Sequence, residues 1–275
     1  MDMGRFNLAN EFHKEHCEIQ TAFLGKIDLS VIDGEADESI ISSYVRSPEE
    51  ATGKRCKAIR ISGDAAKKKR WMKVLPTLTG VERVELSTNA VSEELMRAVC
   101  QHGDIERLSF GNTRLDSLEQ VAKLSRLTNL WVGSSPRITS FSPLSSLRNL
   151  KSLGIQGNFP HVDGIEALSE LNSLEALFLC GAESKDLTIE SLGPVSALSH
   201  LKFLNLTAIR VRSGGLKPLC ELPRLEYLSI DPFHMNIWQH SDIVALHEAH
   251  PALQGSLIHR VATEPEIARR LQVGR

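Results

Sequence analysis

Residues 143–158 read Pro143-Leu-Ser-Ser-Leu-Arg-Asn-Leu-Lys-Ser-Leu-Gly-Ile-Gln-Gly-Asn158 and contain the pattern Leu-x-x-Leu-x-Leu, here as Leu150, Leu153 and Ile155. Six further good copies start at Val81, Ile105, Leu127, Leu174, Leu201 and Leu225, and a weaker copy starts at Cys56. Successive starts lie 25, 24, 22, 23, 24, 27 and 24 residues apart. One such unit cannot bury its own apolar residues, so the periodicity predicts stacked repeats that share one continuous core.

Each copy of the pattern predicts a short strand whose pattern residues point into the stack. The chain must then turn away, cross the outer side and return for the next strand. Helical spacing predicts helices within Ser92–Gly103 and Leu115–Arg126. Proline and glycine predict 3-10 turns within Ser140–Arg148 and Gly214–Leu222.

The segment from Pro143 to Asn158 closely resembles the short leucine-rich repeats of internalins and of the phosphatase-regulating subfamily, and the resemblance covers roughly Cys56 to Ile230. It implies an α/β fold: a curved solenoid with a concave parallel sheet, convex short helices and 3-10 turns, terminal caps and a protein-binding role. The asparagine that this family places three residues after the last strand leucine occurs only at Asn89 and Asn158. Asp64, Thr113 and Ser135 are partial substitutes, but Ala182, Ile209 and Phe233 are not, so the asparagine ladder is incomplete and the curvature near the C-terminal end stays open.

Outside the repeats, the chain is expected to form caps that cover the ends of the stack. We expect an N-terminal cap over residues 1–55, a solenoid of about eight repeats over 56–230, and a C-terminal cap and tail over 231–275. Leu24-x-x-Ile27-x-Leu29 resembles one more degenerate strand, and Leu253-x-x-Ser256-x-Ile258 a last capping strand. The charged tail Glu264–Arg275 is expected to be frayed.

Strand alternation predicts which side chains project from the concave face. The projecting positions include an arginine cluster and an aromatic track, followed by an acidic residue: Arg60, Arg83 and Arg107; Trp131, Phe178, Phe203 and Tyr227; and Asp231. Trp, Tyr and Arg are the residues that most often dominate binding energy, so these eight are the predicted partner-binding residues. Gly111, Gly133 and Gly154 would leave a shallow trough.

Two simpler interpretations of these residues stay open. The phenylalanines would pack against one another or against a flanking loop, and the arginines would pair with Glu82, Glu85 and Glu106.

Bulk composition points away from several other functions. The 275 residues carry a net charge of −2, with a pI of about 6.6, which offers no general attraction for nucleic acid or acidic membranes. No stretch approaches the ~20 apolar residues of a membrane span, and the N-terminus lacks the apolar run of a signal peptide. Five widely spaced cysteines favour free thiols in a reducing compartment. We therefore expect a cytoplasmic protein that is monomeric on its own.

Catalytic and metal-binding readings are weak. His13-x-x-His16-Cys17 and His247-x-x-His250 each place possible ligands on one helical face, but structural zinc usually needs four ligands in compact pairs. Cys180, which should project into the trough beside Phe178, is the best candidate nucleophile. We expect no metal, no cofactor and no enzymatic activity.

The sequence therefore predicts a module that binds one specific protein on its concave face, as a regulator or inhibitor such as a toxin-neutralising immunity protein. One alternative is an adaptor that holds two proteins and uses the N-terminal 55 residues, with 6 Lys/Arg against 11 Asp/Glu, as a second surface. The other, less favoured, is an enzyme that uses Cys180.

Overall fold

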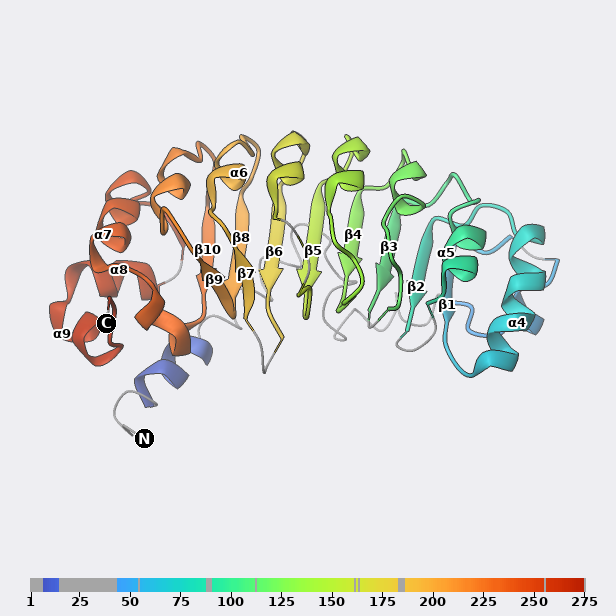
Figure 1. Cartoon of the computed structure of the whole chain (residues 1–275), viewed down its shortest axis with the longest axis horizontal. Helices are drawn as coiled ribbons and strands as arrows, with labels where there is room; N and C mark the ends of the chain where they lie inside the picture. Colours follow the sequence, from blue (N-terminus) through green and yellow to red (C-terminus); the bar gives the residue numbers. More distant parts are fainter. Residues whose placement is uncertain are drawn as a thin grey trace.

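The computed structural model describes residues 7–14, 44–53, 55–87, 91–111, 113–160, 162, 164–182, 186–254 and 256–274. Its repeats stack into an arc, with the strands side by side and short helices or 3-10 turns along one margin (Figure 1). The predicted solenoid is confirmed.

One parallel sheet of eight strands, in the order β1-β2-β3-β4-β5-β6-β8-β10, runs through the arc. The strands are β1 Ala58–Ile61, β2 Arg83–Leu86, β3 Arg107–Phe110, β4 Asn129–Val132, β5 Ser152–Gln156, β6 Ala176–Cys180, β8 Phe203–Thr207 and β10 Tyr227–Ile230. Each strand pairs with the next at the same position of the repeat, as Leu130 of β4 pairs with Leu153 of β5. The sequence period therefore translates directly into the register of the sheet.

The pattern residues form the core, as predicted. All three in every copy are buried, and Leu150, Leu153 and Ile155 are each 0% exposed. The apolar residues six positions before each copy from the second onward, Leu75 to Leu219, are 0% exposed as well. Burying a leucine stabilises a fold by about 1.5–3 kcal/mol, so the repeated leucines are the main source of stability.

The convex segments mostly take the predicted forms. Helix α5, Glu93–Val99, lies within Ser92–Gly103, and the turns η3, Ser142–Ser146, and η5, Lys217–Glu221, lie within the two proline-containing segments. The helix predicted within Leu115–Arg126 is wrong, because only the 3-10 turn η2, Val121–Lys123, forms there. The buried residues of that segment, Leu115, Leu118, Val121 and Leu124, are spaced by three, which fits a 3-10 period as well as a helical one.

The remaining convex elements are the turn η1, the turn η4 and the short helix α6, which span Leu75–Thr77, Glu166–Glu170 and Gly193–Ser196.

The longest repeat contains an element that the sequence did not predict. Strand β7, Leu187–Ile189, pairs in parallel with β9, Ile209–Val211, in a separate two-stranded sheet. The 27-residue spacing between Leu174 and Leu201 provides the extra length for β7.

Two of the three residues proposed to replace the family's asparagine do hold buried hydrogen bonds. The hydroxyl groups of Thr113 and Ser135 lie 2.8 Å apart, and the Ser135 hydroxyl donates to the Gly133 carbonyl at 2.9 Å. Asp64 has a different role, because its side chain accepts from the Lys67 amide and caps helix α4, Ala65–Val74. Asn89 lies outside the described residues.

The two ends of the predicted N-terminal cap lie at opposite ends of the arc. Val45 forms a parallel bridge with Ile59 of β1, and the short helix α3, Pro48–Ala51, follows. The helix over residues 7–14 lies instead beside the C-terminal helices (Figure 1), where the Glu11 carboxylate contacts the Arg260 guanidinium at 3.2 Å. A single cap over residues 1–55 is therefore wrong for residues 7–14. The strand proposed from Leu24 to Leu29 lies outside the described residues.

The C-terminal cap is helical. It consists of η6, Pro232–Ile237, followed by α7, His240–Ala249, α8, Ser256–Thr263, and α9, Pro265–Arg270. The predicted capping strand is wrong beyond Gln254, which bridges Tyr227 of β10, because α8 begins two residues later. The frayed tail is also wrong: Ile267 and Leu271 are 5% and 0% exposed, so their burial holds α9 against the cap.

Candidate functional site

Two rows of side chains cross the concave face of the sheet, as strand alternation predicted. The register places Arg83 beside Arg107 in one row and Arg60 beside Glu85 in the other. Further along the same two rows, Phe203 stands beside Tyr227, and Trp131 beside Gly154. Every predicted partner-binding residue except Asp231 lies in one of these rows.

Both rows are cationic at the N-terminal end of the sheet. The first row has Arg83 on β2 and Arg107 on β3, and the second row has Arg60 on β1. Arg60 donates from Nε to Glu85 Oε2 at 2.8 Å, and its Nη2 lies 2.6 Å from the same oxygen. The Arg60 guanidinium also lies over the Tyr44 ring, 5.5 Å from its centroid. These contacts hold Arg60 in a fixed position, half-buried, at the edge of the concave face.

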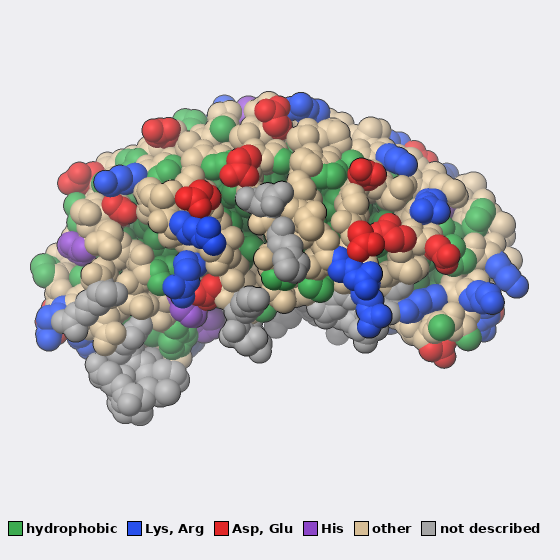
Figure 2. Space-filling model, viewed as in Figure 1, with side chains coloured by type: hydrophobic (Ala, Val, Ile, Leu, Met, Phe, Trp, Pro, Cys, Tyr) green, Lys and Arg blue, Asp and Glu red, His purple; other side chains and the backbone are tan. Residues whose placement is uncertain are grey.

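The simpler reading of the arginines, pairing with neighbouring glutamates, holds for Arg60. Glu82 pairs with Lys57 and Glu106 with Arg126. Figure 2 shows acidic and basic side chains next to one another on the flank that it displays. Within the described part of the chain, no ion pair joins Arg83 to an acidic residue. The cationic end therefore keeps a positive charge that Glu85 alone does not balance.

Tyr44 belongs to this end of the face, although it lies outside the repeats and the sequence did not single it out. Burial and then the Glu85 carboxylate raise the pKa of the Tyr44 hydroxyl, against an opposing effect of the three arginines. The phenol therefore stays neutral and can donate a hydrogen bond at neutral pH. Tyr44 is placed here by the neighbouring bridge between Val45 and Ile59. The repeat pattern in the sequence does not predict this pairing.

Trp131 marks the boundary between two halves of the concave face. Its indole ring is half-buried and lies over Gly154, where an added Cβ would come within 1.8 Å of the ring. Its edge contacts the Phe178 ring, with centroids 5.9 Å apart and an interplanar angle of 63°. The ring therefore fills the predicted trough at Gly154.

The aromatic residues beyond Trp131 are not an accessible track, and this part of the prediction is wrong. Phe178, Phe203 and Tyr227 are 1%, 0% and 1% exposed. Phe203 lies 4.8 Å from Phe178 and stacks on Tyr227 at 4.7 Å and 7°, in a hydrophobic cluster separate from the main core. The side chains leave the sheet on the predicted side, but their burial makes them packing residues in this conformation.

Asp231 also has a structural role that the sequence did not indicate. Its carboxylate accepts from the Phe233 amide at 2.8 Å and lies 2.6 Å from His234 Nδ1. These contacts begin η6, so Asp231 orients the first turn of the C-terminal cap rather than extending the concave row.

Two of the cysteines that the structure describes lie in environments that disfavour nucleophilic chemistry. Burial raises the pKa of the Cys100 thiol to about 12, and burial, followed by Asp242, raises that of Cys220. Cys180, the candidate nucleophile, ends strand β6 and lies 3.2 Å from Asn205 Oδ1. Reactive thiols need a lowered pKa, usually from a helix N-terminus or a cation.

The histidines proposed as metal ligands have other contacts where the structure describes them. His250 contacts the Leu219 backbone oxygen, and the rings of His13 and His247 lie against those of Phe233 and His259. His16 and Cys17 lie outside the described residues. The described residues contain no group of three side chains that could hold a metal, and no described helix is long and apolar enough to cross a bilayer.

No protein-family model and no curated protein sequence matches this chain. Among solved structures, internalin C2 from Listeria monocytogenes is 24% identical with a TM-score of 0.46, over 62% of this chain and 67% of that one. A leucine-rich-repeat protein from Leptospira interrogans is 16% identical, with a TM-score of 0.43 over 67% and 43%. Leucine-rich repeat-containing protein LegL7 from Legionella pneumophila is 17% identical, with a TM-score of 0.44 over 78% and 81%. The Leu-x-x-Leu-x-Leu periodicity and the parallel sheet that it forms give this chain the fold of a leucine-rich-repeat solenoid.

Proposed function

We propose that this chain is a protein-binding module whose cationic concave end binds an acidic surface of one partner protein. The cationic concave end comprises Arg60, Arg83 and Arg107, with Tyr44 and Trp131 at its margins. By occupying that surface, the chain would act as a regulator or inhibitor of its partner.

The division of the concave face is the observation that carries this proposal. From β1 to β4 the projecting arginines and Trp131 are partly exposed, whereas from β6 onward the aromatic residues are buried. A partner can contact the first half without any change in the chain. Arg, Trp and Tyr are enriched among residues that dominate binding energy, and truncating one at a central position typically costs about 2 kcal/mol or more.

The charge of this surface favours an acidic partner. Glu85 already pairs with Arg60, and among the described residues no ion pair joins Arg83 to a carboxylate. Arg83 and Arg107 stand in register on neighbouring strands, at the roughly 5 Å spacing of strands in a sheet. Two cations at that spacing repel one another, and a carboxylate placed between them relieves the repulsion. Binding should therefore weaken as salt concentration rises.

We further propose that the chain works as a monomer in the cytoplasm. The cysteines that the structure describes, Cys56, Cys100, Cys180 and Cys220, are all free thiols, which suits a reducing compartment.

Charge reversal tests the proposal. Arg83→Glu/Arg107→Glu should reduce capture of acidic proteins from native lysate at least tenfold, as measured by quantitative mass spectrometry against the unmodified chain. The matched control is Arg114→Glu/Arg224→Glu, which changes net charge by the same amount at two exposed positions away from the sheet. The control should capture the same proteins as the unmodified chain. Equal losses in both variants, or a loss in neither, would contradict a role for the cationic concave end.

A further inference from the structure

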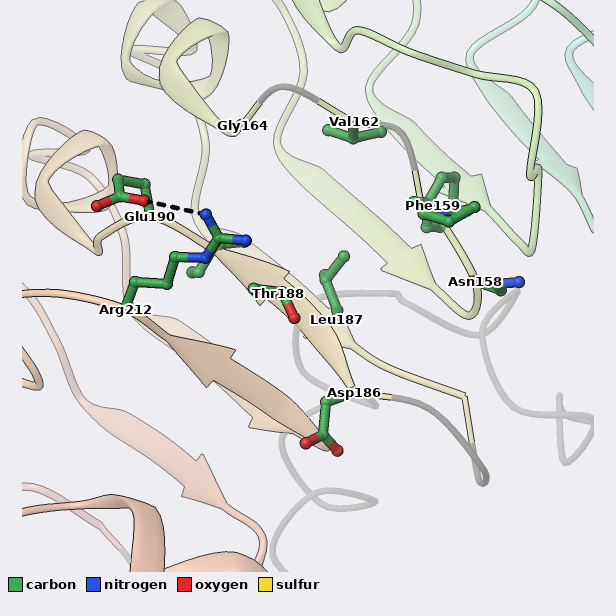
Figure 3. Close-up of a pocket in the computed structure, with 11 residues that line it drawn as sticks. Asn158, Phe159, Val162, Gly164, Asp186, Leu187, Thr188, Glu190 and Arg212 are labelled. Atoms are coloured by element: carbon green, nitrogen blue, oxygen red, sulfur yellow. Dashed lines mark ion pairs between the residues drawn. The ribbon is translucent and has the colours of Figure 1, made fainter.

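The acidic side chains at the surface cleft beside β7 are already paired within the chain. Glu190 lies 3.8 Å from Arg212 (Figure 3), and Asp186 lies 3.1 Å from Arg210. These carboxylates therefore select no charged ligand for the cleft. Polar atoms without a partner lie instead in the interior of the solenoid.

One of these interior atoms belongs to a group that titrates near neutral pH. Among the described residues, four buried side-chain atoms have no hydrogen-bond partner: Trp71 Nε1, His102 Nε2, Ser152 Oγ and Trp238 Nε1. Indole and hydroxyl groups keep their protons throughout the physiological pH range. An imidazole gains or loses a proton within it, so His102 is the member of this group that can respond to pH.

His102 stands where the repeat pattern places a leucine. The other six good copies have a leucine at this position, and each is at most 4% exposed: Leu78, Leu124, Leu147, Leu171, Leu198 and Leu222. The His102 ring is half-buried, but its Nε2 atom is fully covered. A group that can carry charge therefore replaces an apolar side chain of the core.

Protonation of His102 is unfavourable in the closed repeat. It would place a charge and an N–H donor at a buried atom that has no acceptor. Burial accordingly lowers the pKa of His102 from its ordinary 6.5, although a hydrogen bond to the Leu75 backbone and the Asp104 carboxylate act in the opposite direction. In an opened repeat the ring lies in water and has its ordinary pKa. Between these two pKa values the opened repeat binds more protons than the closed one, so falling pH favours opening.

The charged groups of its own repeat do not provide a partner for the buried nitrogen. Asp104, the charged residue that acts on the ring, is exposed and pairs with Arg126 at 2.8 Å. The Cys100 thiol has a pKa of about 12 and stays neutral. Arg97, the basic residue in the last turn of α5, is exposed.

The two neighbouring repeats add no acidic group. The preceding repeat contributes η1, Leu75–Thr77, which contains no ionisable side chain. The following repeat contributes η2 with Lys123, whose ammonium group bonds to the Gln120 side chain at 3.0 Å. A cation at this position does not stabilise a protonated imidazole.

His102 lies in the segment that joins the two strands of the arginine pair. Strand β2 carries Arg83, strand β3 carries Arg107, and the two residues stand in register. Each repeat of a solenoid contacts only its neighbours, so local opening between two strands acts first on those strands. Opening at His102 would therefore disturb the alignment of the two guanidinium groups.

We propose that His102 is a pH sensor of the cationic concave end: its protonation loosens the repeat between β2 and β3 and thereby releases an acidic partner. The release rests on the proposed function. The loosening rests on the buried imidazole alone, so the two parts can fail separately.

Hydrogen exchange with a matched pair of variants tests the loosening. His102→Gln removes the titrating group, and His200→Gln is the control at an exposed histidine. Exchange of residues 91–111 is measured at about pH 7.5 and about pH 5, corrected for the intrinsic effect of pH, and compared with residues 127–158, which contain no histidine. In the unmodified chain and in His200→Gln, the protection of residues 91–111 should fall at least threefold relative to the reference segment. In His102→Gln this relative protection should stay unchanged.

A second variant serves if His102→Gln does not fold. His102→Leu restores the residue of the other repeats and should raise the midpoint of urea unfolding at neutral pH, while also abolishing the loss of protection at low pH. Titration of the His102 ring in the unmodified chain, followed by NMR, should give a midpoint below 6.5.

An acidic peptide probe tests the release. A fluorescent deca-aspartate peptide stays ionised at both pH values, because the pKa of aspartate is about 3.9. By fluorescence anisotropy, the unmodified chain and His200→Gln should bind it at least threefold more weakly at about pH 5 than at about pH 7.5. His102→Gln should bind it equally at both.

Each measurement has an outcome that overturns its part of the inference. A titration midpoint at or above 6.5, or an equal loss of protection in His102→Gln, would overturn the loosening. Loosening without weaker probe binding would overturn the release. No probe binding at either pH would overturn the proposed function and the release with it, while hydrogen exchange would still decide the loosening.

Discussion

Replacing Gly154 by alanine should displace Trp131 and loosen the boundary between the two halves of the concave face. The new Cβ would lie 1.8 Å from Trp131 Cε3 and 2.2 Å from Cζ3, far inside van der Waals contact, so the indole must move away. The backbone of Gly154 is not in the left-handed region, so alanine adds no backbone strain. The whole effect therefore comes from the ring.

The magnitude follows from three contributions. Returning about 60 Å² of apolar ring surface to water, at about 25 cal/mol per Å², costs about 1.5 kcal/mol. Losing the edge-to-face contact with Phe178 costs about 1 kcal/mol more. Alanine in place of glycine within a strand returns about 0.5 kcal/mol. We expect the free energy of unfolding to fall by about 2 kcal/mol.

Urea unfolding and tryptophan quenching measure this change. Trp71 and Trp238 are 0% and 2% exposed, so Trp131 should dominate quenching by iodide, and quenching should increase in Gly154→Ala. Gly111→Ala is the matched control, because its Cβ would meet only the Gly133 Cα, at 3.8 Å, and both measurements should stay unchanged. In a Trp131→Ala background, Gly154→Ala should cost nothing. Unchanged stability and quenching in Gly154→Ala would refute the placement of the ring over Gly154.

Three further predictions concern stability and the chain ends. Phe203→Ala should lower the free energy of unfolding in urea by about 3 kcal/mol, because this buried ring stacks between two others; a loss below about 1 kcal/mol would contradict its packing role. Arg260→Ala removes the ion pair with Glu11 and should speed hydrogen exchange in residues 7–14, whereas faster exchange throughout the chain would indicate global destabilisation instead. The Lys202 ammonium lowers the pKa of Glu175, so this pair stabilises the fold above about pH 4.5 and loses that contribution as pH falls through the lower folded-state pKa. The difference in urea stability between the unmodified chain and Glu175→Gln should shrink below pH 4.5, and a constant difference would contradict the pairing.

The repeats made most of the fold predictable from the sequence. Pattern residues at a fixed spacing determine both the strands and their register, because each unit can bury its leucines only against an identical neighbour. The same alternation gave the correct side of the sheet for all seven predicted partner-binding residues within the strands. The spacing of apolar residues predicted the convex segments less well. A spacing of three fits both an α-helix and a 3-10 turn, and the segment at Val121 forms the 3-10 turn.

The tertiary structure alone decided which concave residues are accessible. Alternation determines the side of the sheet from which Phe203 or Tyr227 leaves, but exposure depends on how the side chains of neighbouring repeats pack, and here the rings pack on one another. Tyr44 joined the cationic concave end through a single bridge next to it, and residues 7–14 joined the C-terminal cap through Glu11 and Arg260. Such contacts leave no periodic trace in the sequence, because each is made once, between segments that share no repeat.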